Sequence, residues 1–243
     1  MSVINSVGYP NPIRSHFRSM DIWQTASGSE DYWQTGWLGR YLDNNCAGCT
    51  HQAIELDESL SLALKGDARS GFAMDNVRMP KQASENRFLK SVGEQAHSHG
   101  HETVAYLYKS MIETQQSADY LFERSKVYSS NEQYPVGDFG RDMKQVAELI
   151  TADTDTRVYY VNLGSFDTHA GQANTHARLL KQFSDGVGAF VKDLQSNKLF
   201  DDVMIMAFSE FGRRVKQNAS RGTDHGTANN VFLIGNQLKR QID

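Results

Sequence analysis

Three short apolar runs stand out in the last part of the chain, at 158–164, 203–208 and 230–235. Each run is rich in β-branched or aromatic residues and is bounded by Gly, Asp or Asn, which predicts three strands. Between the first two runs, apolar residues recur at three- and four-residue steps from Leu179 to Leu194, which predicts a helix. Strand, helix and strand in this order predict a parallel crossover unit.

The earlier part of the chain is more varied. Alternation over Val3–Val7 predicts a strand, and two prolines then precede a predicted helix that ends near Trp23. Apolar faces predict further helices over 32–42 and 139–150, short strands and turns are expected over 50–80, and a polar helical pattern predicts an insertion over 81–130. No linker is evident, so we expect a single α/β domain over residues 1–243.

Composition and charge exclude several classes of protein. Hydrophobic residues make up 39% and charged residues 22% of the chain, as in an ordinary globular protein. The net charge of -4 lacks the basic footprint of a nucleic-acid-binding protein. No run approaches the roughly 18 apolar residues of a membrane span, and the first residues lack the order of a signal peptide. The sequence as given therefore predicts a cytoplasmic protein without a membrane span.

Two other groups of potential ligands have more ordinary explanations. Cys46 and Cys49 are half a zinc site, a redox pair or two loop thiols, and the absence of a second pair favours loop thiols. His97, His99 and His101 invite a metal interpretation. Their spacing of two residues around Gly100 instead favours a solvated segment.

Acids and imidazoles gather beside the three predicted strands. Asp167 and His169 follow the first, Glu210 follows the second, and Asp224 and His225 precede the third. Ligands of open α/β sheets bind outside the carboxyl ends of the strands, and catalytic metal ions take carboxylate and imidazole ligands from separate elements. Solvated loop residues or helix caps are the alternative, and the spacing alone leaves both interpretations open.

Ser15 and His16 lie where the first predicted helix begins. Free backbone N–H groups and the helix dipole favour an anion there and would assist a nucleophile. The local sequence favours a simpler role for Ser15, as an N-cap.

Several longer runs carry a family resemblance. GSFDTHAGQ, MAFSEFGRR and GTDHGTANNVFLIG, together with the earlier YPNPIRSHFRSMDIWQT and YPVGDFGRDMKQVAELI, closely resemble DUF1501. This family of uncharacterised bacterial proteins is placed in the alkaline phosphatase and sulfatase superfamily. The resemblance implies a doubly wound, mainly parallel α/β sheet flanked by helices. It also implies two divalent metal ions, commonly zinc, manganese or calcium, and a nucleophile at a helix start.

The resemblance also implies roles for individual residues. Ser15 resembles the nucleophile, beside His16, and Arg14 or Arg213 would hold oxygens of the ester. The implied metal ligands are Asp167, His169 and His225, with Glu210 and Asp224 nearby. Two departures leave alternatives: the Asp167–His169 spacing is shorter than usual, so Gln172 or His176 is an alternative partner, and Phe211 stands where a second histidine is expected.

The implied function is metal-dependent hydrolysis of a small anionic ester of phosphate or sulfate. The alternative is a non-catalytic member of the fold that binds a metal or a partner. Family members usually have an earlier strand with an acid ligand, often after an export signal, and continue beyond the last strand. We therefore expect a chain truncated at both ends, a periplasmic or envelope location for the whole protein, and homo-oligomers formed through an unpaired strand edge.

Overall fold

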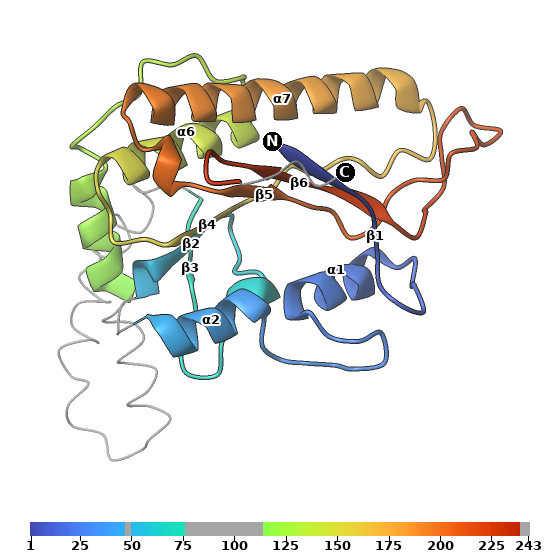
Figure 1. The fold of residues 1–243 in the computed structure, drawn as a ribbon, viewed down its shortest axis with the longest axis horizontal. Coiled ribbons are helices and arrows are strands. Elements are labelled where there is room, and N and C mark those ends of the chain that lie inside the picture. Colours follow the sequence, from blue (N-terminus) through green and yellow to red (C-terminus); the bar gives the residue numbers. More distant parts are fainter. Residues whose placement is uncertain (47–49, 76–113, 239–243) are drawn as a thin grey trace.

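The computed structural model describes residues 1–46, 50–75 and 114–238. Cys49, the three histidines at 97–101 and most of the predicted insertion lie outside these ranges, although 114–124 is helical. The chain is confirmed as a mixed α/β protein, with two three-stranded sheets and helices on both sides of them (Figure 1).

The first sheet is parallel and has the order β3-β2-β4. It comprises β2 (Ala53–Leu56), β3 (Phe72–Ala73) and β4 (Val158–Val161). All four residues of β2 are buried, as expected for the central strand of a parallel sheet covered on both faces.

The second sheet is antiparallel and has the order β1-β6-β5. It comprises β1 (Ser2–Val7), β5 (Ile205–Ala207) and β6 (Asn229–Ile234). The expectation of a mainly parallel sheet is therefore correct for the first sheet and wrong for the second. The connection 208–228 contains no helix, and without a crossover helix β6 returns antiparallel beside β5. β1 pairs with β6 on one side, and its other edge is where the self-association predicted from the sequence would occur.

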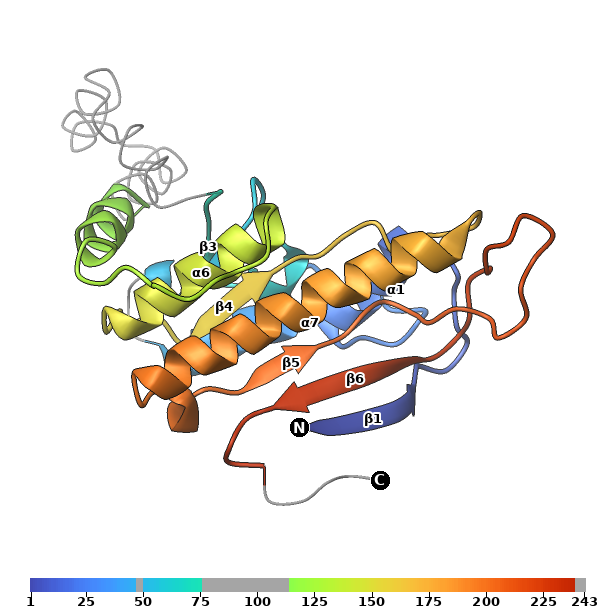
Figure 2. The ribbon, with the colours of Figure 1, turned by 90° about the horizontal axis from the view of Figure 1, so that it is seen from above.

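Figure 2 shows β4 and β5 pointing the same way beneath the helix that connects them. This helix, α7 (Gln172–Ser196), and α6 (Asp138–Thr151) cover one side of the sheets, while α1 (His16–Thr25) and α2 (Trp37–Asn45) cover the other (Figure 1). The remaining short helices are 3-10 turns: η1 (Thr50–Gln52), η2 (Leu62–Leu64) and η4 (Phe200–Asp202). None of the helices in the described ranges is long and apolar enough to cross a membrane.

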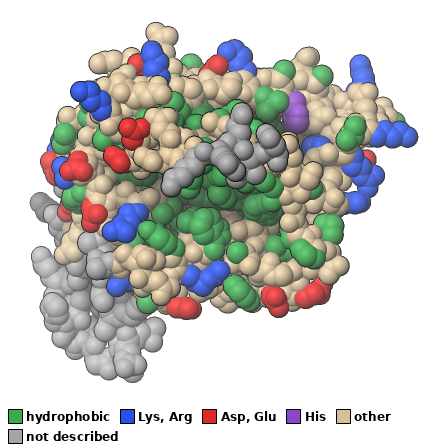
Figure 3. Space-filling view, in the orientation of Figure 1, with side chains coloured by type: hydrophobic (Ala, Val, Ile, Leu, Met, Phe, Trp, Pro, Cys, Tyr) green, Lys and Arg blue, Asp and Glu red, His purple; other side chains and the backbone are tan. Residues whose placement is uncertain are grey.

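The main core lies between α6, α7 and the sheets. Leu179, Val187, Phe190 and Leu194 of α7 are buried, which confirms the apolar face predicted from their spacing. Gly186 lets α7 approach α6, because a Cβ there would lie 2.6 Å from Cε1 of Phe139. Charged side chains lie mostly around the rim of the face in Figure 3, with hydrophobic side chains gathered in its middle.

The second predicted helix begins later than expected, at Trp37 instead of Tyr32. Gly36 precedes it, and its N–H donates to the carbonyl of Lys65 at 2.8 Å. This contact ties the preceding segment to η2 and leaves Trp33 46% exposed. The buried face of α2 is narrower than predicted, with Leu42 in a smaller core beside β2 and η2.

Candidate functional site

Two loops and one helix start bring the predicted site residues together. His16 is the first residue of α1, and Asp167 and His169 lie in the loop between β4 and α7. Glu210 and His225 lie at opposite ends of the connection between β5 and β6. The side chains that the sequence places beside three strands therefore meet in space, with His225 brought in by the antiparallel return of β6.

Asp167 is the centre of the cluster. Its Oδ1 lies 2.9 Å from Nε2 of His225 and 2.9 Å from Nε2 of His169. Arg213 donates to the same oxygen at 2.7 Å, while Oδ2 lies 3.3 Å from Nε2 of His16. One carboxylate thus contacts three imidazoles and a guanidinium.

His16 is held by Glu210 on its other side. Its Nδ1 lies 2.6 Å from Oε1 of Glu210, and the Glu210 carbonyl accepts a hydrogen bond from the Trp23 indole at 2.9 Å. Nε2 of His16 is buried and has no hydrogen-bond partner of good geometry among the described residues. The buried ring of Phe211 lies 4.9 Å from the His16 ring and 4.6 Å from the His225 ring, measured between centroids.

His169 and Asp224 form the outer part of the cluster. Nδ1 of His169 lies 3.2 Å from Oδ1 of Asp224, and its Nε2 lies 3.0 Å from Nε2 of His225. Asn218 donates to Asp224 at 3.2 Å and to the His169 carbonyl at 3.0 Å, so one amide fixes both residues.

The two alternative partners proposed for Asp167 lie elsewhere. Gln172 donates to the hydroxyls of Thr168 at 2.9 Å and Thr223 at 2.8 Å, and so braces the loops without contacting the carboxylate. The His176 ring lies 5.6 Å from the Phe166 ring, and its buried Nε2 has no hydrogen-bond partner among the described residues.

Asp167 and Asp224, two of the three carboxylates of the cluster, favour the charged form. Desolvation acts to raise the pKa of Asp167, but hydrogen bonds from Arg213 and His225 and the nearby imidazoles hold that pKa well below its usual range. Hydrogen bonds from Asn218 and His169 lower the pKa of Asp224. Both side chains are therefore anionic acceptors at neutral pH.

The donor set fits a divalent metal ion. His16, Asp167 and His225 each offer one ligand atom, and these atoms lie within 4.8 Å of one another. Two imidazole nitrogens and a carboxylate oxygen are the protein ligands typical of catalytic zinc, and imidazole and carboxylate ligands also suit manganese. The unpartnered Nε2 of His16 is the group that such an ion would satisfy.

Ser15 and Arg14 border this cluster. Ser15 is the N-cap of α1 with extended backbone, its side chain is exposed, and it makes no capping hydrogen bond. The carbonyl of Arg14 accepts a hydrogen bond from Nδ1 of His225 at 2.9 Å. A proton on Nδ1 makes this bond, and Nε2, which lies 2.9 Å from Oδ1 of Asp167, is then the atom that would act as a ligand in place of its contact with that carboxylate.

Sequence reasoning missed the supporting residues. Trp23, Asn218 and Thr223 position Glu210, Asp224 and Arg213, respectively. Of these, only Asn218 carries a local signal, because it stands in a turn-rich stretch that its side chain closes by accepting from the N–H groups of Ser220 and Gly222, both at 3.0 Å.

Comparison with known families gives a match over nearly the whole chain. A family model described as "Protein of unknown function (DUF1501)" matches residues 4–242. No curated protein and no solved structure matches the chain significantly.

Proposed function

Because the chain belongs to the DUF1501 family, we propose that it is a metal-dependent hydrolase of phosphate or sulfate esters. The observation that carries the proposal is the convergence of His16, Asp167 and His225 from three distant parts of the sequence. The resemblance to the alkaline phosphatase and sulfatase superfamily adds the expected reaction class and an alkaline-phosphatase-like fold.

In this proposal, His16, Asp167 and His225 would hold a zinc or manganese ion, because their two imidazole nitrogens do not suit calcium, which takes oxygen ligands. Such an ion would neutralise the anionic ester and polarise one of its oxygens. Glu210 and His169 contact these ligands and fix their orientation, and Asp224 orients His169 in turn. His16 thus joins the ligands, instead of assisting the nucleophile as the sequence suggested.

The chain's own residues supply the nucleophile and a binding group. Ser15 stands exposed at the start of α1, whose free backbone N–H groups favour an anion. Its Oγ would displace the alcohol of the ester, and the serine proton would pass to the departing alcohol oxygen. Water would then release phosphate or sulfate and restore the hydroxyl. Arg14 and Arg213 are the nearest candidates to hold ester oxygens.

The test combines metal content with turnover. Protein purified without chelators is analysed by mass spectrometry, then assayed on p-nitrophenyl phosphate and p-nitrophenyl sulfate with added zinc, manganese or calcium. We expect near-stoichiometric metal, and turnover that Ser15→Ala abolishes and Ser184→Ala, an exposed serine on α7, retains. Turnover by Ser15→Ala would remove Ser15 as nucleophile. Absence of turnover with every metal would overturn the hydrolase proposal.

A second candidate is a non-catalytic member that only binds a metal or a partner. The observation that favours it is Arg213, whose guanidinium already neutralises Asp167 at 2.7 Å. Buried Phe211, in place of an expected histidine, also removes a ligand for a second ion. Stoichiometric metal without turnover of either ester would favour this candidate.

A further inference from the structure

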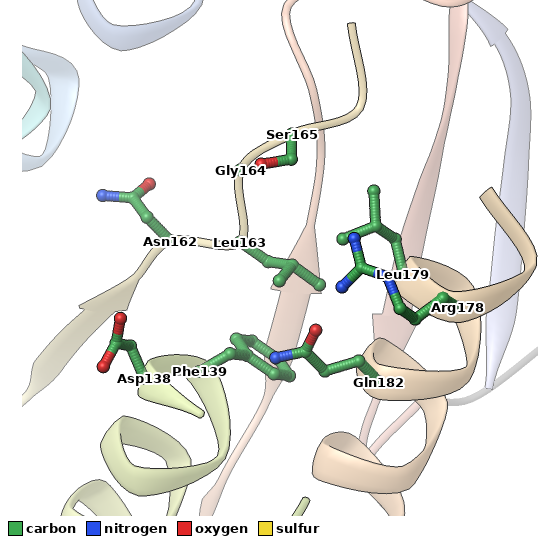
Figure 4. Close-up of a pocket in the computed structure, with 9 residues that line it drawn as sticks. All are labelled: Asp138, Phe139, Asn162, Leu163, Gly164, Ser165, Arg178, Leu179 and Gln182. Carbon is green, nitrogen blue, oxygen red and sulfur yellow. The ribbon is translucent and has the colours of Figure 1, made fainter. Parts of the chain in front are cut away.

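The segment that follows β4 lines a pocket before it reaches Asp167. The pocket has a volume of about 290 Å³ and lies between segment 162–165, the first residues of α6 and the second and third turns of α7. Figure 4 shows it with apolar Leu163, Leu179 and Phe139 among its walls. It shares a loop with the candidate metal centre and is separate from the residues of that centre.

Three polar side chains with no internal partner meet at this pocket. Arg178 and Gln182 are one helical turn apart on α7, and Figure 4 shows both reaching from the helix toward the hollow, with Ser165 on the loop that forms another wall. Among the described residues, none of these three side chains forms a hydrogen bond or an ion pair. Their donors are therefore available to a ligand.

The backbone at Ser165 is unusual. Its φ of 73° lies in the left-handed region, which a residue other than glycine adopts at a cost of about 1 kcal/mol or more. The strained residue belongs to the pocket wall and precedes the candidate metal centre by two positions. Strain of this kind is concentrated at functional sites, where it places a group that the ligand needs.

The chemistry of the three side chains favours an oxyanion. Arg178 offers planar N–H donors that match a carboxylate, phosphate or sulfate, and the Gln182 amide and Ser165 hydroxyl add further donors. Asp138 lines the opposite side of the pocket, where an anion would be repelled, although its Oδ1 is paired with Arg141 at 2.8 Å. The anion is therefore expected on the Arg178 side.

We propose that this pocket binds an oxyanion group of the substrate, separate from the ester group at the metal centre. The proposal rests on the proposed function and narrows its substrate class to esters that carry a second anionic group. Ser165 and Asp167 lie two positions apart, and two residues of extended chain span at most about 7 Å. The wall of the pocket is therefore joined directly to the metal centre, and we expect one small molecule with two anionic groups to reach both sites.

Anion binding can be measured without any turnover. Metal-free protein is titrated with inorganic phosphate, sulfate or acetate while the amide resonances of Gly164, Ser165 and Gln182 are followed by NMR. We expect saturable shifts, and the anion with the tightest binding identifies the chemistry of the group. In Arg178→Gln the affinity should fall at least about tenfold, as expected for a lost bidentate charge-assisted contact. Arg178→Lys should lie between the two.

Two further variants separate binding from folding. Lys192→Gln removes one positive charge from α7 about 21 Å from Arg178 along the helix and should bind anions unchanged. Ser165→Gly relieves the left-handed strain, so it should be more stable and yet bind anions more weakly. Absence of saturable shifts, or equal affinity in Arg178→Gln, would overturn the proposal.

Turnover then tests the link to the metal centre. Arg178→Gln should raise KM for 4-carboxyphenyl phosphate and leave KM for phenyl phosphate unchanged, because only the first ester carries a second anionic group. An equal change for both esters would contradict a two-anion substrate. A protein that binds anions at Arg178 but hydrolyses neither ester would fail as a hydrolase while keeping the anion site.

Discussion

Nδ1 of His16 lies 2.6 Å from Oε1 of Glu210, although 194 positions separate the two residues in the sequence. The contact joins the first helix to the loop that follows β5. It also turns Nε2 of His16 toward Asp167, at 3.3 Å from Oδ2. The carboxylate of Glu210 thus fixes the orientation of a candidate metal ligand from behind.

This pair gives the first prediction. Glu210→Gln keeps the size of the side chain and removes its charge, so His16 should be less well oriented. We expect zinc affinity to fall about 10- to 100-fold, the usual cost of losing such a supporting contact. Competition with a chromophoric chelator measures it. His176→Gln is the matched control and should bind zinc normally, because the His176 ring packs on Phe166 away from the cluster. Weaker zinc binding by His176→Gln would instead indicate that His176 is a metal ligand.

Two glycines of α7 offer a paired test of helix packing. A Cβ at Gly186 would lie 2.6 Å from the Phe139 ring, whereas one at Gly188 would meet nothing within 4 Å. Gly186→Ala should therefore lower the free energy of unfolding by about 1–3 kcal/mol through overpacking. Gly188→Ala should raise it by about 0.5–1 kcal/mol, because alanine favours the helix. Urea unfolding measures the free energy of unfolding of both variants. A higher free energy of unfolding in both would mean that the Phe139 ring moves aside at little cost.

A buried carboxylate ties α7 to the segment before α6. Asp193 is 1% exposed and accepts hydrogen bonds from the hydroxyls of Tyr128 at 2.8 Å and Tyr134 at 3.0 Å. Desolvation and the charge of Asp193 raise the pKa of Tyr134 well above its usual value, so this hydroxyl stays protonated and donates.

Asp193→Ala would leave these hydroxyls without their acceptor. We expect the free energy of unfolding to fall by about 3 kcal/mol, since each buried polar group left unsatisfied costs about 1–3 kcal/mol. Chemical denaturation measures the loss. Asp185→Ala removes an exposed acid of the same helix, which pairs with Lys181, and should change stability by less than about 1 kcal/mol. Similar losses in the two variants would refute the special role of Asp193.

Asp142 gives a prediction about pH. Desolvation is the main cause that raises the pKa of Asp142 to about 6, against an opposing contribution from Arg141. The folded state therefore holds a proton that the unfolded state loses near pH 4. The contribution of Asp142 to stability is full below that pH and declines as pH rises toward 6, by up to roughly 3 kcal/mol.

Asp142→Asn stays neutral and keeps an oxygen acceptor for Arg141. It should be more stable than the unchanged protein at pH 7, with the difference vanishing near pH 4. Urea unfolding at a series of pH values measures this difference. Asp153→Asn, which removes the charge of an exposed acid, is the control. A difference that does not vary with pH would contradict the raised pKa.

Local periodicity predicts the elements well and their pairing poorly. The apolar runs at 158–164 and 203–208 contain β4 and β5, the run at 230–235 overlaps β6 except for Asn229, and the spacing from Leu179 to Leu194 lies within α7. These signals arise from side chains that face a core, so they are readable from the sequence. The antiparallel return of β6 depends on the path of loop 208–228 and on pairing with β1, neither of which has a local pattern.

Part of the candidate site can likewise be predicted from local sequence and part cannot. Acids and imidazoles that follow strands predict Asp167, His169 and Glu210 as neighbours, because the carboxyl ends of parallel strands meet at one edge of a sheet. His225 precedes β6 and reaches this edge because β6 runs antiparallel to β5. The position of His16 among them is not predictable from its surroundings, where Ser15 reads as an ordinary N-cap. Its contacts are made across the whole fold and depend on how α1 packs beneath the second sheet.

The pairing of the first strand with the last has a consequence for synthesis on the ribosome. β1 lies at residues 2–7 and β6 at residues 229–234, and the cluster needs both His16 and His225. At about 5–20 residues per second, roughly 10–40 s pass between the translation of these two histidines. During that interval, β1 has no partner strand, and α1 lacks the complete loop between β5 and β6 that contacts it in the folded protein. A nascent chain of this protein is therefore expected to need protection by a chaperone until its last strand emerges.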